Sequence, residues 1–240
     1  RARTRARTNR ELSAKNAAIE RERQRADQLL KNILPEATAE ELKTYNRVQP
    51  VRYESVSVIF TDFVGFTYLA ESMSPEELVA ELDECFRMMD EIVVRCGLEK
   101  IKTLGDGYMC AGGLPTPNAS HPYDAVVAAL EMQTALTARM KAKTALGKAV
   151  FTMRVGIHTG PVVAGVVGSR KFAYDIWGDT VNTAARMEQS GEPGKVNISE
   201  TTWRLVKDRF QCVYRGHVKA KNKGELAMYF VEGSVNGGMT

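Results

Sequence analysis

Two aspartates, Asp62 and Asp106, stand at positions where they could bind metal ions. Asp62 ends the apolar run VSVIFTD, a buried strand by its pattern, and Gly65 follows closely, where its small size lets backbone N–H groups approach a ligand. Asp106 lies in the sequence LGDG, where Asp106 and Gly107 predict the turn of a hairpin. Neighbouring strands of one sheet would bring the two carboxylates together, giving the hard oxygen ligands that two Mg²⁺ ions on a triphosphate require.

Each aspartate also has a simpler explanation when taken alone. Asp62 could be only the N-cap of the following helix, and Asp106 only the first residue of an Asp-Gly turn. The two positions taken together, with the segment 154–188, favour the chemical interpretation. His158, in GIHTG, is a single histidine at a strand end, where a structural role is the commoner one.

The elements that must position these residues follow a β-α-β-β-α-β order. After strand 56–62, Ser74 predicts the N-cap of a helix that starts at Pro75 and ends before Gly97. The hairpin in LEKIKTLGDGYMCAGG comes next, then a helix over about 123–143 and two strands, VFTMRVGIH and GPVVAGVVG. This order predicts an α+β fold with an antiparallel-rich sheet and helices on one face, the ferredoxin-like plan, extended by strands near QCVYRGHV and ELAMYFVEG.

The first 34 residues have a different pattern, typical of a coiled-coil helix. The seam of this coiled coil has hydrophobic or small residues every seven positions: Leu12, Ile19, Ala26 and Ile33. Of the intervening seam positions Asn16, Arg23 and Leu30, two are polar, so the expected pairing is weak. A plain dimerising stalk and a helix that passes a signal to the following domain both remain open. Pro35 should end or kink this helix. The expected division is helix 1–34, linker 35–52, a folded α+β domain over 53–233 and a flexible tail 234–240.

The composition favours a globular protein without a nucleic-acid partner. The 240 residues are 44% hydrophobic and 26% charged, as in globular proteins, and the formal charge is +4. Five arginines fall in the first ten residues; without those ten, 28 basic residues face 29 acidic ones, which argues against a nucleic-acid partner. Four cysteines without C-x-x-C spacing predict reduced thiols and a cytoplasmic catalytic region. The chain has no apolar run of membrane length and starts with Arg, so an upstream sensor or membrane domain is expected in a longer protein.

Three stretches resemble the class III adenylyl and guanylyl cyclases: VIFTDFVGFT at 58–67, IKTLGDGYM at 101–109 and RVGIHTGPVVAGVVGSRKFAYDIWGDTVNTAARME at 154–188. The resemblance covers about residues 50–233 without a large gap. It implies a homodimer, joined through the catalytic domain and the N-terminal coiled coil, with each active site built from both subunits. It further implies ATP as substrate and two Mg²⁺ or Mn²⁺ ions per site.

The resemblance also implies a role for each matching residue. Asp62 and Asp106 would be the metal ligands of one subunit, with the backbone of Phe63, Val64, Gly65 and Phe66 around the phosphates and Arg170 on the same side. The partner subunit would supply Lys102 and Asp175 for the base, Asn182 for the ribose, and Arg186 and Lys223 for phosphate charge. Asn182 and Arg186 are four residues apart in a predicted helix and so share a face.

Two of these positions predict the base. A lysine donor suits N1 of adenine and an aspartate acceptor suits its exocyclic amine, whereas guanine presents the opposite pattern. Guanylyl cyclases typically carry Glu and Cys there, so Lys102 with Asp175 favours ATP. The assignment of Lys223 is open, because KAKNKGE replaces the family's compact K-G-K-G turn and Lys221 could take its place.

The predicted function is adenylate cyclase, a lyase that forms 3',5'-cyclic AMP and pyrophosphate from ATP in signal transduction. A guanylate cyclase and a catalytically silent nucleotide-binding regulatory module are the alternatives. A P-loop phosphotransferase is disfavoured because the chain lacks G-x-x-x-x-G-K-[ST].

Overall fold

The computed structural model describes residues 2–148, 150–168 and 172–235, and it divides into two units. One unit comprises residues 1–50 and 165–174, and the other comprises residues 51–164 and 175–240. Among the described residues, no helix combines the length and apolar character needed to cross a lipid bilayer.

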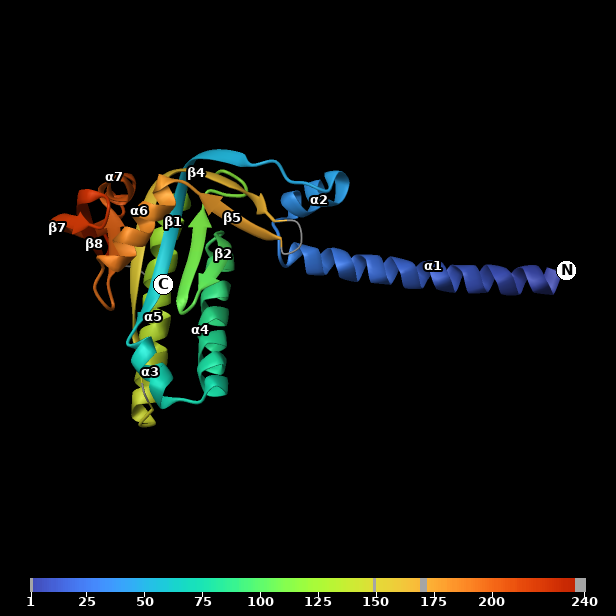
Figure 1. Ribbon diagram of the computed structural model, residues 1–240, viewed down its shortest axis with the longest axis horizontal. Coiled ribbons are helices and arrows are strands. Elements are labelled where there is room, and N and C mark those ends of the chain that lie inside the picture. The colour runs from blue at the N-terminus through green and yellow to red at the C-terminus, as the bar shows by residue number, and fades with distance from the viewer. Residues whose placement is uncertain (1, 149, 169–171, 236–240) are drawn as a thin grey trace. The chain divides into compact units, whose positions relative to one another are not determined.

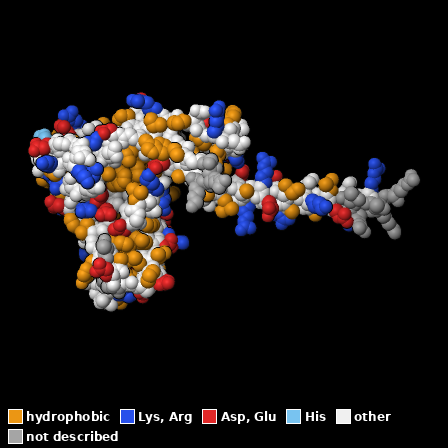
Figure 2. All heavy atoms as spheres, viewed as in Figure 1, with side chains coloured by type: hydrophobic (Ala, Val, Ile, Leu, Met, Phe, Trp, Pro, Cys, Tyr) orange, Lys and Arg blue, Asp and Glu red, His pale blue; other side chains and the backbone are white. Residues whose placement is uncertain are grey.

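The first unit is mainly helical. Helix α1 (Ala2–Lys31) ends before Ile33, three residues earlier than predicted, and α2 (Glu36–Tyr45) begins directly after Pro35. The predicted linker 35–52 is therefore partly a helix, whose residues Thr38, Ala39 and Leu42 are buried. The seam residues Leu12 and Ile19 are 56% and 65% exposed. Figure 2 shows charged side chains of both signs beside hydrophobic ones along α1, so coiled-coil pairing stays a prediction.

The second unit contains most of the sheet, which has the strand order β2-β3-β1-β4-β6-β8-β7 with β5 paired to β4 (Figure 1). Its strands are β1 (Val51–Val64), β2 (Glu99–Leu104), β3 (Gly107–Gly112), β4 (Thr152–Val167), β5 (Ala173–Trp177), β6 (Val196–Ser199), β7 (Phe210–Ala220) and β8 (Gly224–Ser234). Its helices are α3 (Phe66–Ser72), α4 (Pro75–Arg95), α5 (His121–Ala145), α6 (Asp179–Gln189) and α7 (Glu200–Val206). The order β1-α4-β2-β3-α5-β4 confirms the predicted α+β plan.

Helices α4 and α5 cover one face of the sheet because both present apolar stripes to it. Ile59 of β1 and Ile157 of β4, paired in register, lie in the same buried cluster as Met89 of α4 and Met132 of α5. Ser74 caps α4 through a reciprocal pair of hydrogen bonds with Glu77, as the sequence predicted for this N-terminus. The core of the catalytic region therefore lies between the sheet and these two helices.

Helix α6 packs on the opposite face, where glycines leave room for it. A Cβ atom on Gly156 would lie 1.9 Å from the backbone nitrogen of Glu188, and one on Gly160 would lie 2.6 Å from the Thr180 hydroxyl. Such contacts require glycine, because no side chain fits between the helix and strand β4. The two helices of the β-α-β-β-α-β core, α4 and α5, therefore share one face as predicted, and α6 adds a layer on the other face.

Two local predictions also differ from the structure. The segments VFTMRVGIH and GPVVAGVVG form one strand, β4, and not two. Pro161 lies within this strand, opposite the point between Tyr53 and Val56 where the register with β1 shifts. Proline is tolerated at such a bulge because no hydrogen bond between the strands is required from its nitrogen. The hairpin turn is Gly105–Asp106, one residue earlier than predicted, since Leu104 pairs with Gly107 and Gly105 has a φ of 64°.

Candidate active site

Strand pairing brings Asp62 and Asp106 together, as the sequence predicted. Thr61 of β1 pairs with Tyr108 of β3, so Asp62 lies beside the residues that follow the hairpin turn. The backbones are in close contact here, because a Cβ on Gly107 would lie 3.1 Å from the Thr61 carbonyl oxygen. Burial raises the pKa of Asp106 above its usual value, and the neighbouring charge of Asp62 adds to this shift.

The two carboxylates fit a divalent cation, which prefers hard oxygen ligands. Among the described residues, no group of three or more His, Cys, Asp or Glu side chains is arranged to hold a metal ion by itself. Remaining ligands would come from phosphate oxygens and water, as expected where a metal ion binds together with a nucleotide.

The turn between β1 and α3 is held by aromatic packing. Phe63 and Phe66 are buried, with ring centroids 4.6 Å and 6.0 Å from that of Phe151. Gly65, between them, has a φ of 87°, a conformation that side chains disfavour. Because the phenylalanine side chains are buried in the core, the backbone between them is available to a ligand.

Arg154 and Glu188 adjoin Asp62, and neither was predicted as a site residue. Arg154 lies opposite Asp62 in the β1–β4 register, and its Nη2 donates to Asp62 Oδ2 at 2.7 Å. Its Nε donates to Glu188 Oε1 at 2.9 Å. Burial raises the pKa of Glu188 to about 6 against the opposing charge of Arg154. One guanidinium therefore joins the predicted metal ligand to a buried carboxylate.

Lys102 and Asp175 come together although 73 residues separate them. The lysine Nζ lies 2.5 Å from Asp175 Oδ2, and their side chains are 38% and 17% exposed. Asp175 is fixed further, since its Oδ1 accepts a hydrogen bond from the Ile176 N–H. The two predicted base-reading side chains thus form one donor–acceptor pair.

Three further predicted residues lie on helix α6 and on the β7–β8 turn that contacts the start of this helix. Asn182 and Arg186 lie on α6, away from its buried face of Thr180, Thr183, Ala184, Met187 and Glu188. Lys223 forms an ion pair with Asp179 in the first turn of this helix, whereas Lys221 is exposed. The contact favours Lys223 over Lys221 as the lysine that serves the site. Arg170 lies outside the described residues.

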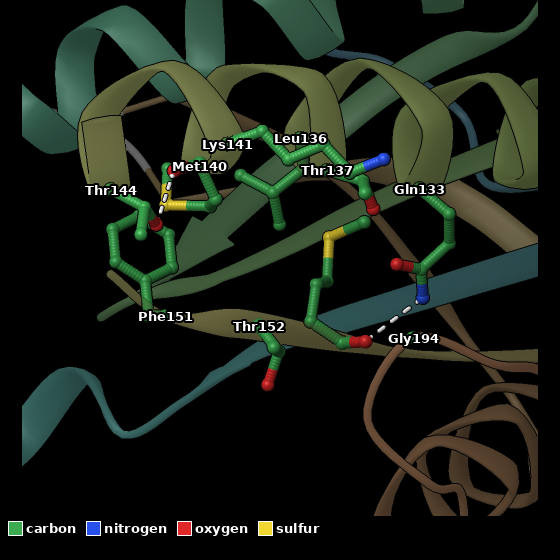
Figure 3. Close-up of a pocket in the computed structure, with 10 residues that line it drawn as sticks. Gln133, Leu136, Thr137, Met140, Lys141, Thr144, Phe151, Thr152 and Gly194 are labelled. Carbon is green, nitrogen blue, oxygen red and sulfur yellow. Dashed lines mark hydrogen bonds between the residues drawn. The ribbon is translucent and has the colours of Figure 1, made fainter.

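A separate cavity of about 170 Å³ lies between α5 and the start of β4 (Figure 3). Leu136, Met140, Phe151 and Met153 give it an apolar lining, and the Gln133 amide donates to the Met153 carbonyl oxygen at 2.8 Å. It contains none of the predicted site residues and no carboxylate. This cavity is a feature of the helix–sheet packing and does not belong to the candidate active site.

His158 is tied to the fold by its Nδ1, which lies 2.7 Å from the Ser199 hydroxyl. A chain of buried hydroxyl groups continues through Thr202, Thr159 and Ser57 to the Nδ1 of His121. Burial lowers the pKa of His158 to about 4, with Lys223 adding to the shift and Asp179 opposing it. The ring is therefore neutral at pH 7.

We expect His158 to make the protein less stable in mild acid. Its folded pKa of about 4 lies below the ordinary 6.5, so its contribution is complete above pH 6.5 and is lost as the pH falls toward 4. The loss over this range should reach up to about 3 kcal/mol. Urea unfolding from pH 7.5 to 4 should therefore show a flatter pH dependence for His158→Asn than for wild type. The exposed His217→Asn serves as control, and equal slopes in all three chains would contradict the expectation.

Comparison with known proteins agrees with this geometry. The sequence pattern of the family described as "Adenylate and Guanylate cyclase catalytic domain" matches residues 48–233. The chain is 42% identical over 225 residues to an adenylate cyclase of Mycobacterium tuberculosis, covering 93% of this chain and 50% of that protein. It is 37% identical to the guanylate cyclase soluble subunit beta-2 of Rattus norvegicus, covering 90% of this chain and 31% of that protein. The chain thus spans about half the length of its mycobacterial relative. It spans about a third of the length of the rat protein.

Solved structures lead to the same family. The guanylate cyclase domain of RhGC from Catenaria anguillulae, in complex with GTP, superposes with a TM-score of 0.73 at 32% identity, covering 77% of this chain and 99% of that one. The adenylyl cyclase CyaB from P. aeruginosa gives a TM-score of 0.73 at 29% identity, covering 76% and 95%. Because the family pattern matches residues 48–233, more than half of the chain, and the fold agrees with these structures, the chain belongs to the adenylate and guanylate cyclase catalytic domain family.

Proposed function

We propose that this chain is the catalytic region of an adenylate cyclase, which converts ATP to 3',5'-cyclic AMP and pyrophosphate at sites shared by two copies. The observation that carries the proposal is the Lys102–Asp175 pair, because it offers a donor and an acceptor in one fixed arrangement. Adenine complements this arrangement through N1 and its exocyclic amine.

The reaction is an in-line attack of the ribose 3'-oxygen on the α-phosphorus: a new P–O bond forms as the bond to pyrophosphate breaks. Asp62 and Asp106 hold two Mg²⁺ or Mn²⁺ ions, which when bound lower the pKa of the 3'-hydroxyl and offset phosphate charge. The backbone of residues 63–66 surrounds the phosphates. Arg170 remains a further phosphate contact expected from the resemblance.

The second half of each site comes from the partner copy. Its Asn182 orients the ribose, and Arg186, four residues later on the same face of α6, stabilises charge that develops on the α-phosphate. Lys223 supplies a further positive charge at the start of this helix, where its contact with Asp179 places it. A homodimer therefore contains two equivalent sites, and α1 supports its pairing.

The expected regulation and location follow from the same family. The coiled-coil helix connects the catalytic region to an upstream sensor or membrane domain, so the catalytic region is cytoplasmic. The free cysteines, of which Cys85 and Cys110 are buried, suit a reducing compartment.

The direct test is product formation by the purified chain with ATP and with GTP, each in Mg²⁺ and in Mn²⁺. Cyclic AMP should form from ATP at a rate well above cyclic GTP from GTP. Faster turnover of GTP would make the chain a guanylate cyclase, and nucleotide binding without any cyclic product in saturating Mn²⁺ would make it a silent regulatory module.

A further inference from the structure

A buried carboxylate lies behind the predicted metal ligands, and the mechanism above does not use it. Glu188, whose side chain is 8% exposed, contacts Arg154, and Arg154 in turn contacts Asp62. A buried ion pair gives little net stability by itself, since desolvation offsets the attraction. The position of Glu188 therefore calls for an explanation beyond holding the fold together.

The backbone fixes Glu188 firmly against strand β4. Helix α6 touches Gly156 so closely that no side chain fits there, and the Asn197 amide donates to the Met187 carbonyl oxygen at 2.7 Å. The Arg215 guanidinium donates to the Ser190 carbonyl oxygen at 2.8 Å. Hydrogen bonds thus hold the backbone at Met187 and Ser190, on either side of Glu188. Glu188 packs against Gly156, which lies two residues from Arg154 on the same face of β4.

The balance of charge shows what Glu188 does to the site. Without it, the Arg154 guanidinium would form a simple pair with Asp62 and neutralise this carboxylate. With it, Arg154 is shared between two carboxylates, so Asp62, Asp106, Glu188 and Arg154 together carry two negative charges. A guanidinium held by Glu188 competes less with a divalent cation for Asp62.

We propose that Glu188 is a positioning residue that holds Arg154 away from full pairing with Asp62 and so keeps Asp62 available to divalent cations. The inference rests on the proposed function, because it takes Asp62 and Asp106 as the metal ligands. It concerns the affinity of the chain for the metal ion before any nucleotide binds, and so it can be tested without measuring cyclase activity.

The test is Mn²⁺ binding to the full chain at pH 8 without nucleotide, followed by electron paramagnetic resonance of free Mn²⁺. Glu188→Gln keeps the shape of the side chain and removes its charge, and we expect it to weaken Mn²⁺ binding about tenfold. Glu81→Gln is the matched control, since Glu81 is 7% exposed and pairs with Arg139 in the helix layer. It should leave Mn²⁺ binding unchanged.

A double-mutant cycle shows whether Glu188 acts through Arg154. In an Arg154→Gln background, Glu188→Gln should weaken Mn²⁺ binding less than about threefold. An equal loss in both backgrounds would mean that Glu188 acts on the cation directly, and no loss in either would mean that it only packs; both overturn the inference.

Asp62→Asn tests the metal site itself: if it leaves Mn²⁺ binding as in wild type, the proposed site fails and the inference with it. Thermal unfolding of each variant checks that it folds.

Discussion

An equal mixture of Asp62→Ala and Lys102→Ala chains is expected to regain about a quarter of wild-type cyclase activity, although each variant alone loses activity by about 10²-fold or more. Asp62 and Lys102 belong to different halves of the site, so a mixed dimer contains one site with both halves intact. Random pairing makes half of the dimers mixed, and each has one working site of two. Coexpression with two affinity tags isolates the mixed dimer, which has one working site of two and should therefore produce cyclic AMP at about half the wild-type rate.

The matched control is a mixture of Asp62→Ala with Asp106→Ala chains. Both aspartates serve the same half of the site, since strand pairing places them side by side in one subunit. Every site of every dimer then lacks one metal ligand, so no activity should return. Recovery in this control, or failure of the first mixture with both chains folded and paired, would contradict a shared site.

The positions of Asp62 and Asp106 could be predicted because local signals fix them. An apolar strand that ends in Asp62 and a Gly-Asp-Gly turn at Asp106 specify two adjacent strand ends once the β-α-β-β order is recognised. The N-terminus of α4 was predictable for the same reason, since Ser74, Pro75 and Glu77 form a capping motif within four residues.

Arg154 and Glu188 were missed because their contacts depend on register across distant strands. Arg154 is 92 residues from Asp62, and only the β1–β4 pairing places them opposite each other. A signal was present in MRVGIH, where Met153, Val155 and Ile157 alternate with residues that do not belong in a core. This alternation predicts that Arg154 lies on the α6 face, although it does not identify Asp62 as its partner.

Helix α2 was missed because Pro35 was interpreted only as a stop. A proline fits equally well just before a helix, where its missing N–H has no partner to lose. Thr38, Ala39 and Leu42 are spaced as one buried helical face and could have indicated the new helix. A pattern of ten residues is short, and here its burial depends on contacts that are not local.

If Lys102 and Asp175 bind the base as proposed, exchanging both should reverse the proposed preference for ATP over GTP. Lys102→Glu with Asp175→Cys replaces a donor and an acceptor by the residues expected to suit guanine, so ATP then meets two mismatched groups. At about 2 kcal/mol for each unsatisfied group, the ratio of kcat/KM for ATP over GTP should fall by about 10³-fold. Rates of cyclic AMP and cyclic GTP formation give this ratio.

The single change Lys102→Glu should lower kcat/KM for both ATP and GTP more than the double change does. It would place a second carboxylate against Asp175, which now pairs with the lysine at 2.5 Å, and like charges at this distance repel.

Lys100→Glu is the matched control, because Lys100 lies on the same strand, is 39% exposed and pairs with Asp90 instead. It makes the same change of charge and should leave the ATP-to-GTP ratio unaltered. If the double variant also keeps the wild-type ratio, Lys102 and Asp175 do not select the base, and the preference for ATP must come from other contacts.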